Sequence, residues 1–188
     1  MEHHQHRFTY YESERRKRQN PEQILHNAGL KEGMCFMDIG CNNGFFTLPA
    51  AKIVGENGKI YAVDIDNDAL NELKDKLLMK NISNVKVFNL PAEATMLGEK
   101  MADIIFFGTC LHDFKDPLKV LKNAKTMLKD KGVIYDYDWR KVKTELGPPL
   151  QIRLSTNQVK QLAESAGLRF GASNILDKNF YAVVLEKT

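Results

Sequence analysis

The 188-residue sequence predicts an α/β fold: a three-layer, doubly wound, seven-stranded sheet that is mostly parallel and ends in an antiparallel hairpin. Three observations predict it. From about residue 31, short apolar runs alternate with segments whose apolar residues recur at helical spacing. Several runs are apolar on both faces, as in parallel strands covered by helices on both sides. The last two runs lie too close together for an intervening helix, so they must pair antiparallel.

The individual strands and helices follow from these runs and from capping residues. Five βα-linked strands are expected at 34–37, 59–63, 85–88, 104–107 and 133–135, and the hairpin strands at 168–176 and 180–187. Helices are expected over 45–54 and from Asp66 or Asn67, from Asp116-Pro117, and from Ser155, where Gln158 completes a capping box. The helix from Asp116 is expected to include Leu128 and to stop at Gly132.

Composition excludes several classes of protein. With 43% hydrophobic and 27% charged residues, the chain is neither disordered nor a disulfide scaffold. Its three cysteines, its lack of a membrane-length apolar run and its lack of an N-terminal signal core lead us to expect a cytoplasmic protein. We expect one domain over residues 31–188, preceded by an arm or lid helix over 1–30. The net charge of +3 is too mild to indicate nucleic acid.

A glycine loop after the first strand is the first chemical signal. Gly40 and Gly44 allow a tight turn and a close approach of backbone to ligand. Their spacing fits neither the dinucleotide fingerprint nor the phosphate loop. Asp38, two residues before Gly40, would repel a pyrophosphate and suits a cationic or donor-rich ligand. Asp64, at the end of the second strand, is placed to bind ribose hydroxyls. A plain strand–turn–helix, and a helix cap at Asp64, are the structural alternatives.

Together these motifs resemble those of class I S-adenosylmethionine-dependent methyltransferases, especially the small ones around the ubiquinone/menaquinone-biosynthesis enzymes. Residues 38–44 resemble the family's D-x-G-x-G-x-G, and Val63-Asp64 resembles its ribose-binding acid. Ala92-Glu93, residues 102–112 and residues 128–132 resemble its adenine, fourth-strand and L-K-P-G-G segments. The sequence departs from the pattern at Asn42 (for glycine), at Pro91 (often Asp) and at Asp130-Lys131 (for Pro-Gly).

The resemblance, which covers roughly residues 20–188, implies a Rossmann-like fold. It also implies S-adenosylmethionine as cofactor, S-adenosylhomocysteine as product, and in-line methyl transfer to a small molecule. The cofactor site that it implies consists of Asp38, Gly40, Cys41, Asn42, Gly44, Asp64, Ile65, Ala92, Glu93 and Gly108.

The acceptor site is expected beyond the fourth and fifth strands. His112 has an ordinary pKa near 6.5 that suits a general base, although local packing is an alternative role. Aromatic and basic side chains at Tyr10, Tyr11, Trp139 and Arg140 are candidates for acceptor binding, with a Pro-containing loop over 144–154 around the mouth of the site.

Other polar features carry weaker signals. The basic run 15–18 is interpreted as a solvated helix face. His3, His4 and His6 make a weak metal case, and no metal site is expected. Cys41 and Cys110 could lie close together, as buried side chains or as a thiol pair facing a soft acceptor.

Three alternatives remain open: an RNA or protein methyltransferase, a non-catalytic S-adenosylmethionine-binding protein and, more remotely, a nicotinamide dehydrogenase. The expected partner is a small-molecule acceptor, and the basic residues that gather near the acceptor loop leave an acidic acceptor open. We expect neither a membrane nor a nucleic acid as partner, and the oligomeric state is left open.

Overall fold

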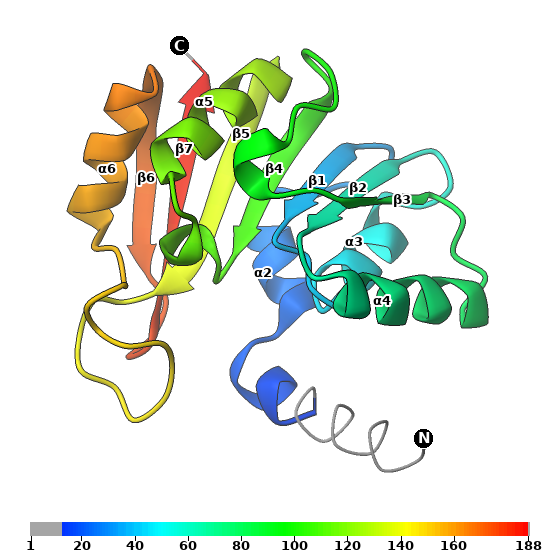
Figure 1. Ribbon diagram of the computed structural model, residues 1–188, viewed down its shortest axis with the longest axis horizontal. Coiled ribbons are helices and arrows are strands. Elements are labelled where there is room, and N and C mark those ends of the chain that lie inside the picture. The colour runs from blue at the N-terminus through cyan, green and yellow to red at the C-terminus, as the bar shows by residue number, and fades with distance from the viewer. Residues whose placement is uncertain (1–12, 188) are drawn as a thin grey trace.

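The computed structural model describes residues 13–187 and contains one seven-stranded sheet. Strands β1 to β5 are parallel, and β7 runs antiparallel between β5 and β6, in the order β3-β2-β1-β4-β5-β7-β6 (Figure 1). Their bounds are β1 Cys35–Ile39, β2 Lys59–Asp64, β3 Val85–Asn89, β4 Ala102–Gly108, β5 Leu128–Trp139, β6 Leu168–Ile175 and β7 Phe180–Lys187. The expected fold class, including the C-terminal hairpin, is confirmed.

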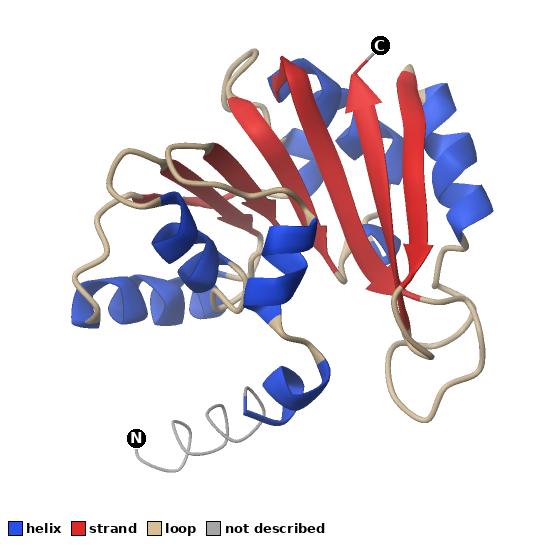
Figure 2. Cartoon of the chain, turned by 180° about the vertical axis from the view of Figure 1, so that it is seen from behind, coloured by secondary structure: helices blue, strands red, loops and turns tan. Residues whose placement is uncertain are grey.

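Helices cover both faces of the sheet, and Figures 1 and 2 show the two faces in turn. One face packs against α5 (Pro117–Met127) and α6 (Thr156–Ser165). The other packs against α2 (Pro21–Asn27), α3 (Thr47–Val54) and α4 (Asn67–Met79). Two short 3-10 turns, η1 (Ala92–Ala94) and η2 (Leu111–Asp113), follow β3 and β4. No helix in the described part of the chain is long and apolar enough to cross a membrane.

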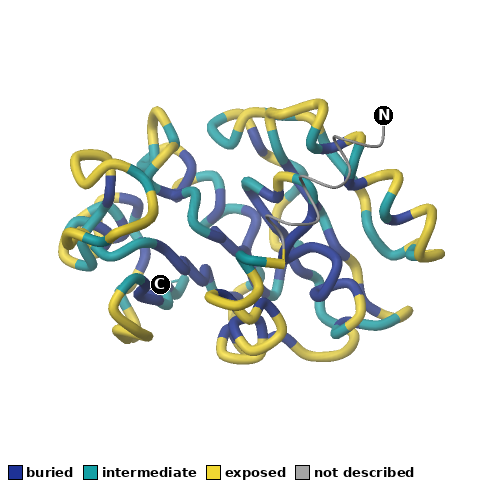
Figure 3. The backbone as a smooth tube through the Cα atoms, turned by 90° about the horizontal axis from the view of Figure 1, so that it is seen from below, coloured by how far each residue is buried: buried dark blue, intermediate teal, exposed yellow. Residues whose placement is uncertain are grey.

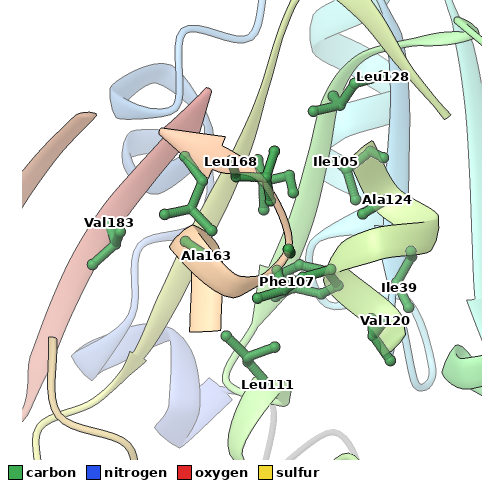
Figure 4. Packing of buried hydrophobic residues seen from close by; sticks show 14 of the residues in the cluster. Ile39, Ile105, Phe107, Leu111, Val120, Ala124, Leu128, Ala163, Leu168 and Val183 are labelled. Atoms are coloured by element: carbon green, nitrogen blue, oxygen red, sulfur yellow. The ribbon is translucent and has the colours of Figure 1, made fainter. Parts of the chain in front are cut away.

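The core lies in two layers because each central strand is apolar on both faces. Along β4, Ile105 and Phe107 point toward α5 and α6, and Figure 4 shows their packing against Val120 and Ala124. The alternate residues of β4 point to the other layer, where the ring of Phe106 stacks on that of Tyr135 and lies tilted against that of Phe46. In Figure 3 the buried segments run through the middle of the molecule, and exposed residues follow the loops and the outer helix faces.

Three of the expected helix starts agree with the structure because each depends on a local cap, whereas the helix expected over 45–54 starts at Thr47 without a side-chain cap. Asp66 accepts hydrogen bonds from the backbone amides of α4, and Asp116 does the same for α5. Ser155 and Gln158 form the expected capping box of α6.

The expected end of the helix from Asp116 is wrong. The helix stops at Met127, and Leu128 already pairs with Ala102 as the first residue of β5. The register then shifts, so that Val133 pairs with Ile104 and residues 129–132 bulge from the strand. Glycine suits this bulge, because a Cβ at Gly132 would lie 2.8 Å from the carbonyl oxygen of Ala102.

The N-terminal residues 21–30 are part of the packed core. Ile24 and Leu25 of α2 are buried in the same cluster as α3 and the sheet. The boundary expected at residue 30 stays a prediction, but α2 lies on the sheet and not over the ligand-binding edge.

Candidate functional site

A pocket of about 560 Å³ lies at the carboxyl ends of the central strands. The strand order reverses between β1 and β4, and open α/β sheets bind their ligands at such a switch point. Eight of the ten expected cofactor residues line this pocket, namely Gly40, Cys41, Asn42, Asp64, Ile65, Ala92, Glu93 and Gly108. Asp38 and Gly44 do not line it.

The glycine loop requires a left-handed backbone at alternate positions. Gly40, Asn42 and Gly44 have φ angles of +82°, +48° and +90°. Among residues with a side chain, asparagine is one of those that tolerate this region best, which explains how Asn42 replaces a glycine. A Cβ at Gly40 would lie 2.7 Å from Sγ of Cys110, so the glycine also permits close packing of the loop on the segment after β4.

Gly44 has a structural role in the same loop. A Cβ there would lie 2.5 Å from Cδ1 of Leu73, a buried residue of α4. The residue therefore allows the loop to pack on α4 and does not contact the pocket.

The carboxylate of Asp64 is fixed at the pocket by backbone amides. Its Oδ2 accepts a hydrogen bond from the amide of Asn42 at 2.7 Å, and its Oδ1 accepts one from the amide of Asp66 at 2.9 Å. Each carboxylate oxygen has a second acceptor site, so two adjacent hydroxyl groups of a ligand can still donate to it. This geometry is suited to a ribose.

Asp38 lies under the glycine loop and is almost fully buried. The hydroxyl of Thr47 donates to its Oδ2 at 2.6 Å, whereas its Oδ1 has no partner among the described residues. Burial raises the pKa of Asp38 to about 7, although the hydrogen bond from Thr47 acts in the opposite direction. A buried acid with an unsatisfied oxygen would be stabilised by a cationic ligand in the adjacent pocket, which fits a sulfonium cofactor.

The far end of the pocket is apolar and is closed by the segment after β3. Ile65, Pro91, Ala92 and Phe114 line this end. Glu93 lines it too, but its Oε1 accepts hydrogen bonds from the backbone amides of Lys115 and Asp116 at 2.9 and 3.3 Å. Burial raises the pKa of Glu93, but these backbone bonds outweigh it and lower the pKa overall.

Arg15 is a pocket residue that the sequence analysis missed. We interpreted its basic run as a solvated helix face, but Arg15 is half-buried and lines the pocket. Its guanidinium carbon lies 4.0 Å from the ring centre of Phe45, and its Nη2 donates to Oγ1 of Thr109 at 3.3 Å. The sequence signal that could have indicated a buried Arg15 is Gln19, four residues further on. Oε1 of Gln19 accepts a hydrogen bond from Nε of Arg15 at 2.7 Å.

The backbone beside Arg15 is strained. Thr109 adopts a φ of +62°, which a β-branched residue rarely does, and its hydroxyl donates to the carbonyl of Gly108 at 2.6 Å. Such strain gathers at functional sites because the surrounding structure must hold it.

His112 lies behind the pocket, with a side chain that is 2% exposed. Its Nδ1 lies 2.8 and 2.9 Å from the two carboxylate oxygens of buried Asp138, and its Nε2 lies 3.4 Å from Oδ1 of Asp113, which does line the pocket. Burial lowers the pKa of His112, but the hydrogen bond and charge of Asp138, with the charge of Asp113, outweigh this and raise it. The structure therefore favours the protonated form of a buried imidazole that does not line the pocket.

Trp139 and Arg140 are not brought to this pocket. Strand β5 continues to Trp139, whose ring packs on Phe180 with 4.4 Å between ring centres. The Nη1 of Arg140 donates to the carbonyls of Asp177 and Lys178 in the hairpin turn. Antiparallel pairing of β5 with β7 directs both residues to the hairpin, which the sequence could not indicate.

Tyr10, Tyr11 and the histidines at 3, 4 and 6 lie outside the described residues.

The loop after β5 is organised by Arg153, which is almost fully buried. Its guanidinium donates to the carbonyl oxygens of residues 140, 142, 146 and 148 and to Oγ1 of Thr144, at 2.9 to 3.2 Å. The loop is therefore an ordered wall. It borders a second hollow of about 420 Å³, lined by Arg18, Lys143, Thr144, Glu145, Leu146, Lys178 and Asn179.

Both expected thiols, Cys41 and Cys110, line the first pocket. Burial raises the pKa of each thiol well above its ordinary value, so both stay protonated at neutral pH. Within residues 13–187, no group of three or more His, Cys, Asp or Glu side chains is arranged to hold a metal ion.

Comparisons with known proteins agree on one family. The family described as the methyltransferase domain matches residues 30–180. The crystal structure of a SAM-dependent methyltransferase from Aquifex aeolicus is 32% identical, covers 88% of each chain and superposes with a TM-score of 0.83. Ubiquinone/menaquinone biosynthesis C-methyltransferase UbiE of Vibrio vulnificus is 33% identical over 56% of this chain. Demethylmenaquinone methyltransferase of Staphylococcus aureus is 26% identical over 59%. The match spans 41% and 45% of the length of these two relatives.

Proposed function

This chain belongs to the methyltransferase-domain family, and from that premise we propose that it transfers a methyl group from S-adenosylmethionine to a small-molecule acceptor. The observation that carries the proposal is the pocket at the switch point, where the fixed carboxylate of Asp64 faces a glycine loop. When bound, S-adenosylmethionine supplies a methyl group on a positively charged sulfur and is converted to S-adenosylhomocysteine.

In this proposal different residues of the pocket bind different parts of the cofactor. Asp64 accepts hydrogen bonds from the ribose hydroxyls, and the apolar residues Ile65, Pro91 and Ala92 enclose the adenine. Gly40 lets the backbone approach the amino-acid end. Asp38 lies beneath the loop, and a positive charge bound nearby would stabilise its carboxylate, which burial and the unpartnered Oδ1 otherwise disfavour.

Calorimetry with S-adenosylmethionine, S-adenosylhomocysteine and NAD tests this proposal. We expect both adenosyl ligands to bind and NAD not to bind. Asp64→Asn should weaken the binding of both adenosyl ligands by about 10- to 100-fold, because hydrogen bonds to a charged group are lost. The matched control is Asp75→Asn on the exposed face of α4, which should leave both affinities unchanged. Binding of NAD alone would overturn the proposal.

The acceptor that we propose is a small molecule with a negative charge. The curated relatives are named for C-methylation in quinone biosynthesis, which supports a small aromatic acceptor. The second hollow supports a negative charge on the acceptor. Its lining includes Arg18 from the helical residues 13–18, Lys143 from the loop after β5 and Lys178 from the turn between β6 and β7, with Glu145 as its one carboxylate. Catalysis then requires these residues to hold the acceptor in line with the methyl group and to exclude water.

A panel of small acceptors tests the charge preference, with S-adenosylhomocysteine formation as the readout. We expect phenols and hydroquinones that carry a carboxylate to react faster than their uncharged analogues. The double variant Lys143→Gln, Lys178→Gln should raise the KM for the acidic acceptors by about 10-fold and leave kcat nearly unchanged. A preference for uncharged acceptors would contradict the proposed negative charge of the acceptor but not the proposed methyl transfer.

For His112 we propose a positioning role at the acceptor end. Its buried ring is held by Asp138 and faces Asp113 at the pocket wall, so it sets the place of Asp113 and of the turn η2. His112→Ala should lower kcat and leave the affinity for S-adenosylmethionine near that of the wild type. An unchanged kcat would remove His112 from the mechanism.

A further inference from the structure

Exposed aliphatic side chains gather on the loop after β5 and beside the turn between β6 and β7. Residues 140–155 link β5 to α6, and Figures 1 and 2 show this loop projecting past the end of the sheet next to that turn. These two segments supply six of the ten exposed large hydrophobic residues of the described chain. The six side chains, which we call the loop–hairpin patch, are 39% to 58% exposed and belong to Val142, Leu146, Leu150, Ile152, Ile175 and Leu176.

The loop that carries most of the patch is held from the inside by Arg153. The guanidinium of this buried residue binds the carbonyl oxygens of residues 142 and 146, so these carbonyls face inward while the side chains of Val142 and Leu146 stay exposed. The amide of Arg140 donates to the carbonyl of Asn179 at 2.7 Å, which joins the start of the loop to the hairpin turn. A fixed surface that keeps aliphatic side chains in water gains free energy when a partner covers it.

Positive charge surrounds the loop–hairpin patch. Two exposed carboxylates lie in its segments, Glu145 and Asp177, and Asp177 already accepts hydrogen bonds from the amides of Asn179 and Phe180. The cations outnumber them, and no ion pair joins any of these cations to an acid of residues 13–187. The exposed cations of the two segments and of the adjoining hollow are Arg18, Lys141, Lys143 and Lys178.

We propose that the loop–hairpin patch docks on the surface of an anionic lipid bilayer. Aliphatic side chains on a projecting loop can enter the boundary between headgroups and acyl chains, and lysines around them attract anionic headgroups. A second copy of this chain fits less well, because it would bring the same cations together. A protein partner also fits less well, because the centres of protein interfaces are enriched in aromatic residues and the six exposed side chains are all aliphatic.

The patch differs from the expectation, drawn from the sequence, that no membrane is a partner. The fold gathers its residues from two segments that are separated by α6 and most of β6, so no single run of the sequence is long or apolar enough to indicate it. Docking would place the second hollow, which lies between the loop and the hairpin turn, beside the lipid headgroups. The docking itself does not depend on methyl transfer.

Sedimentation of the full chain with lipid vesicles tests the docking surface. We expect binding to vesicles of equal parts phosphatidylcholine and phosphatidylglycerol, and binding at least about 10-fold weaker to phosphatidylcholine alone. The double variant Leu150→Gln, Ile175→Gln leaves the lining of the hollow intact and should weaken binding to the anionic vesicles by about 10-fold, because apolar surface is lost. The matched control is Leu78→Gln, Met79→Gln at the end of α4. It removes side chains that are 75% and 73% exposed and should bind as the wild type does.

A charge variant tests the electrostatic part separately. Lys141→Gln should weaken binding to the anionic vesicles by about 5-fold, the effect of one lysine near an anionic surface, and leave binding to phosphatidylcholine unchanged. Added salt should weaken the binding of the wild type to the anionic vesicles, because it screens the same attraction. Circular dichroism of each variant establishes that it is folded.

Four results would overturn the docking surface. They are a wild type that binds neither kind of vesicle, a wild type that binds both equally, a double variant that binds like the wild type, and a control that loses as much as the double variant. A dimer of the wild type without lipid, lost in the double variant, would instead assign the patch to a second copy. Vesicle binding by a chain that binds no adenosyl ligand would overturn the proposed function alone.

Discussion

The buried carboxyl of Asp38 makes the stability of the ligand-free protein depend on pH. Burial raises its pKa from 3.8 to about 7, so the folded state holds a proton that the unfolded state has released. The stabilisation is complete below about pH 4 and is lost as the pH rises through about 7. The difference between the two pKa values corresponds to at most about 4 kcal/mol over the whole window.

Asp38→Asn removes this dependence with little change in shape. The amide cannot ionise, and its oxygen can still accept the hydrogen bond from Thr47. We expect the wild type to lose about 1–3 kcal/mol more stability than the variant between pH 5 and pH 7. Urea denaturation at pH 5, 6, 7 and 8 measures the difference. Burial also raises the pKa of Asp136, but both proteins contain that group, so its contribution cancels.

The same variant separates stability from binding. In the wild type a cationic ligand should restore part of the stability lost above pH 7, because it favours the charged form of Asp38. In Asp38→Asn the affinity for S-adenosylmethionine should fall. The control is Asp75→Asn, which replaces an exposed carboxylate and should follow the wild type at every pH. Superimposable pH profiles for Asp38→Asn and the wild type would refute the reasoning.

Three further predictions concern packing, the acceptor loop and the histidine. Gly44→Ala should lower the free energy of unfolding by about 1–3 kcal/mol in urea denaturation, because the backbone is left-handed and the new Cβ would meet Leu73. Arg153→Ala should speed amide hydrogen exchange throughout residues 140–152, because five hydrogen bonds are lost. Asp138→Asn should lower the pKa of His112 in an NMR titration, because the charge that favours the imidazolium is removed.

Each of these has a matched control. Gly29→Ala has the same left-handed backbone, at φ +83°, but no atom lies within 4 Å of the new Cβ. It should therefore lower the free energy of unfolding by less than Gly44→Ala does. Arg140→Ala removes a half-buried arginine whose side chain bonds to the hairpin turn, so it should leave exchange in residues 141–152 unchanged. Asp113→Asn should shift the pKa of His112 less than Asp138→Asn does, since Asp113 is 60% exposed. Equal effects in a variant and its control would contradict the corresponding argument.

The cofactor half of the site was largely predictable because its residues follow strand ends directly. Once the first two strands are located, Gly40 and Asp64 must meet at one edge of a parallel sheet. The roles within that half were less predictable. Gly44 does not line the pocket and packs on α4, and Glu93, which does line the pocket, also holds the segment before α5.

The acceptor half was less predictable because its residues come from distant parts of the chain. His112 and Asp138 are 26 positions apart and meet only because β4 and β5 pair. Arg153 has no sequence signal at all, since its partners are backbone carbonyls of a loop.

The sequence by itself therefore determined the order of strands and helices, the caps and the glycine loop. Each of these depends on neighbouring residues or on the spacing of apolar residues, which differs between helices and strands. The tertiary structure alone decided that Arg15 turns inward to the pocket while Trp139 turns away from it. Trp139 is the last residue of β5 and Arg15 lies within the helical residues 13–18, and in both places local preferences leave the direction of a long side chain open. Arg15 is directed by the rings of Phe45 and Phe46, and Trp139 by Phe180 on the paired strand. Such contacts exist only once the sheet has formed.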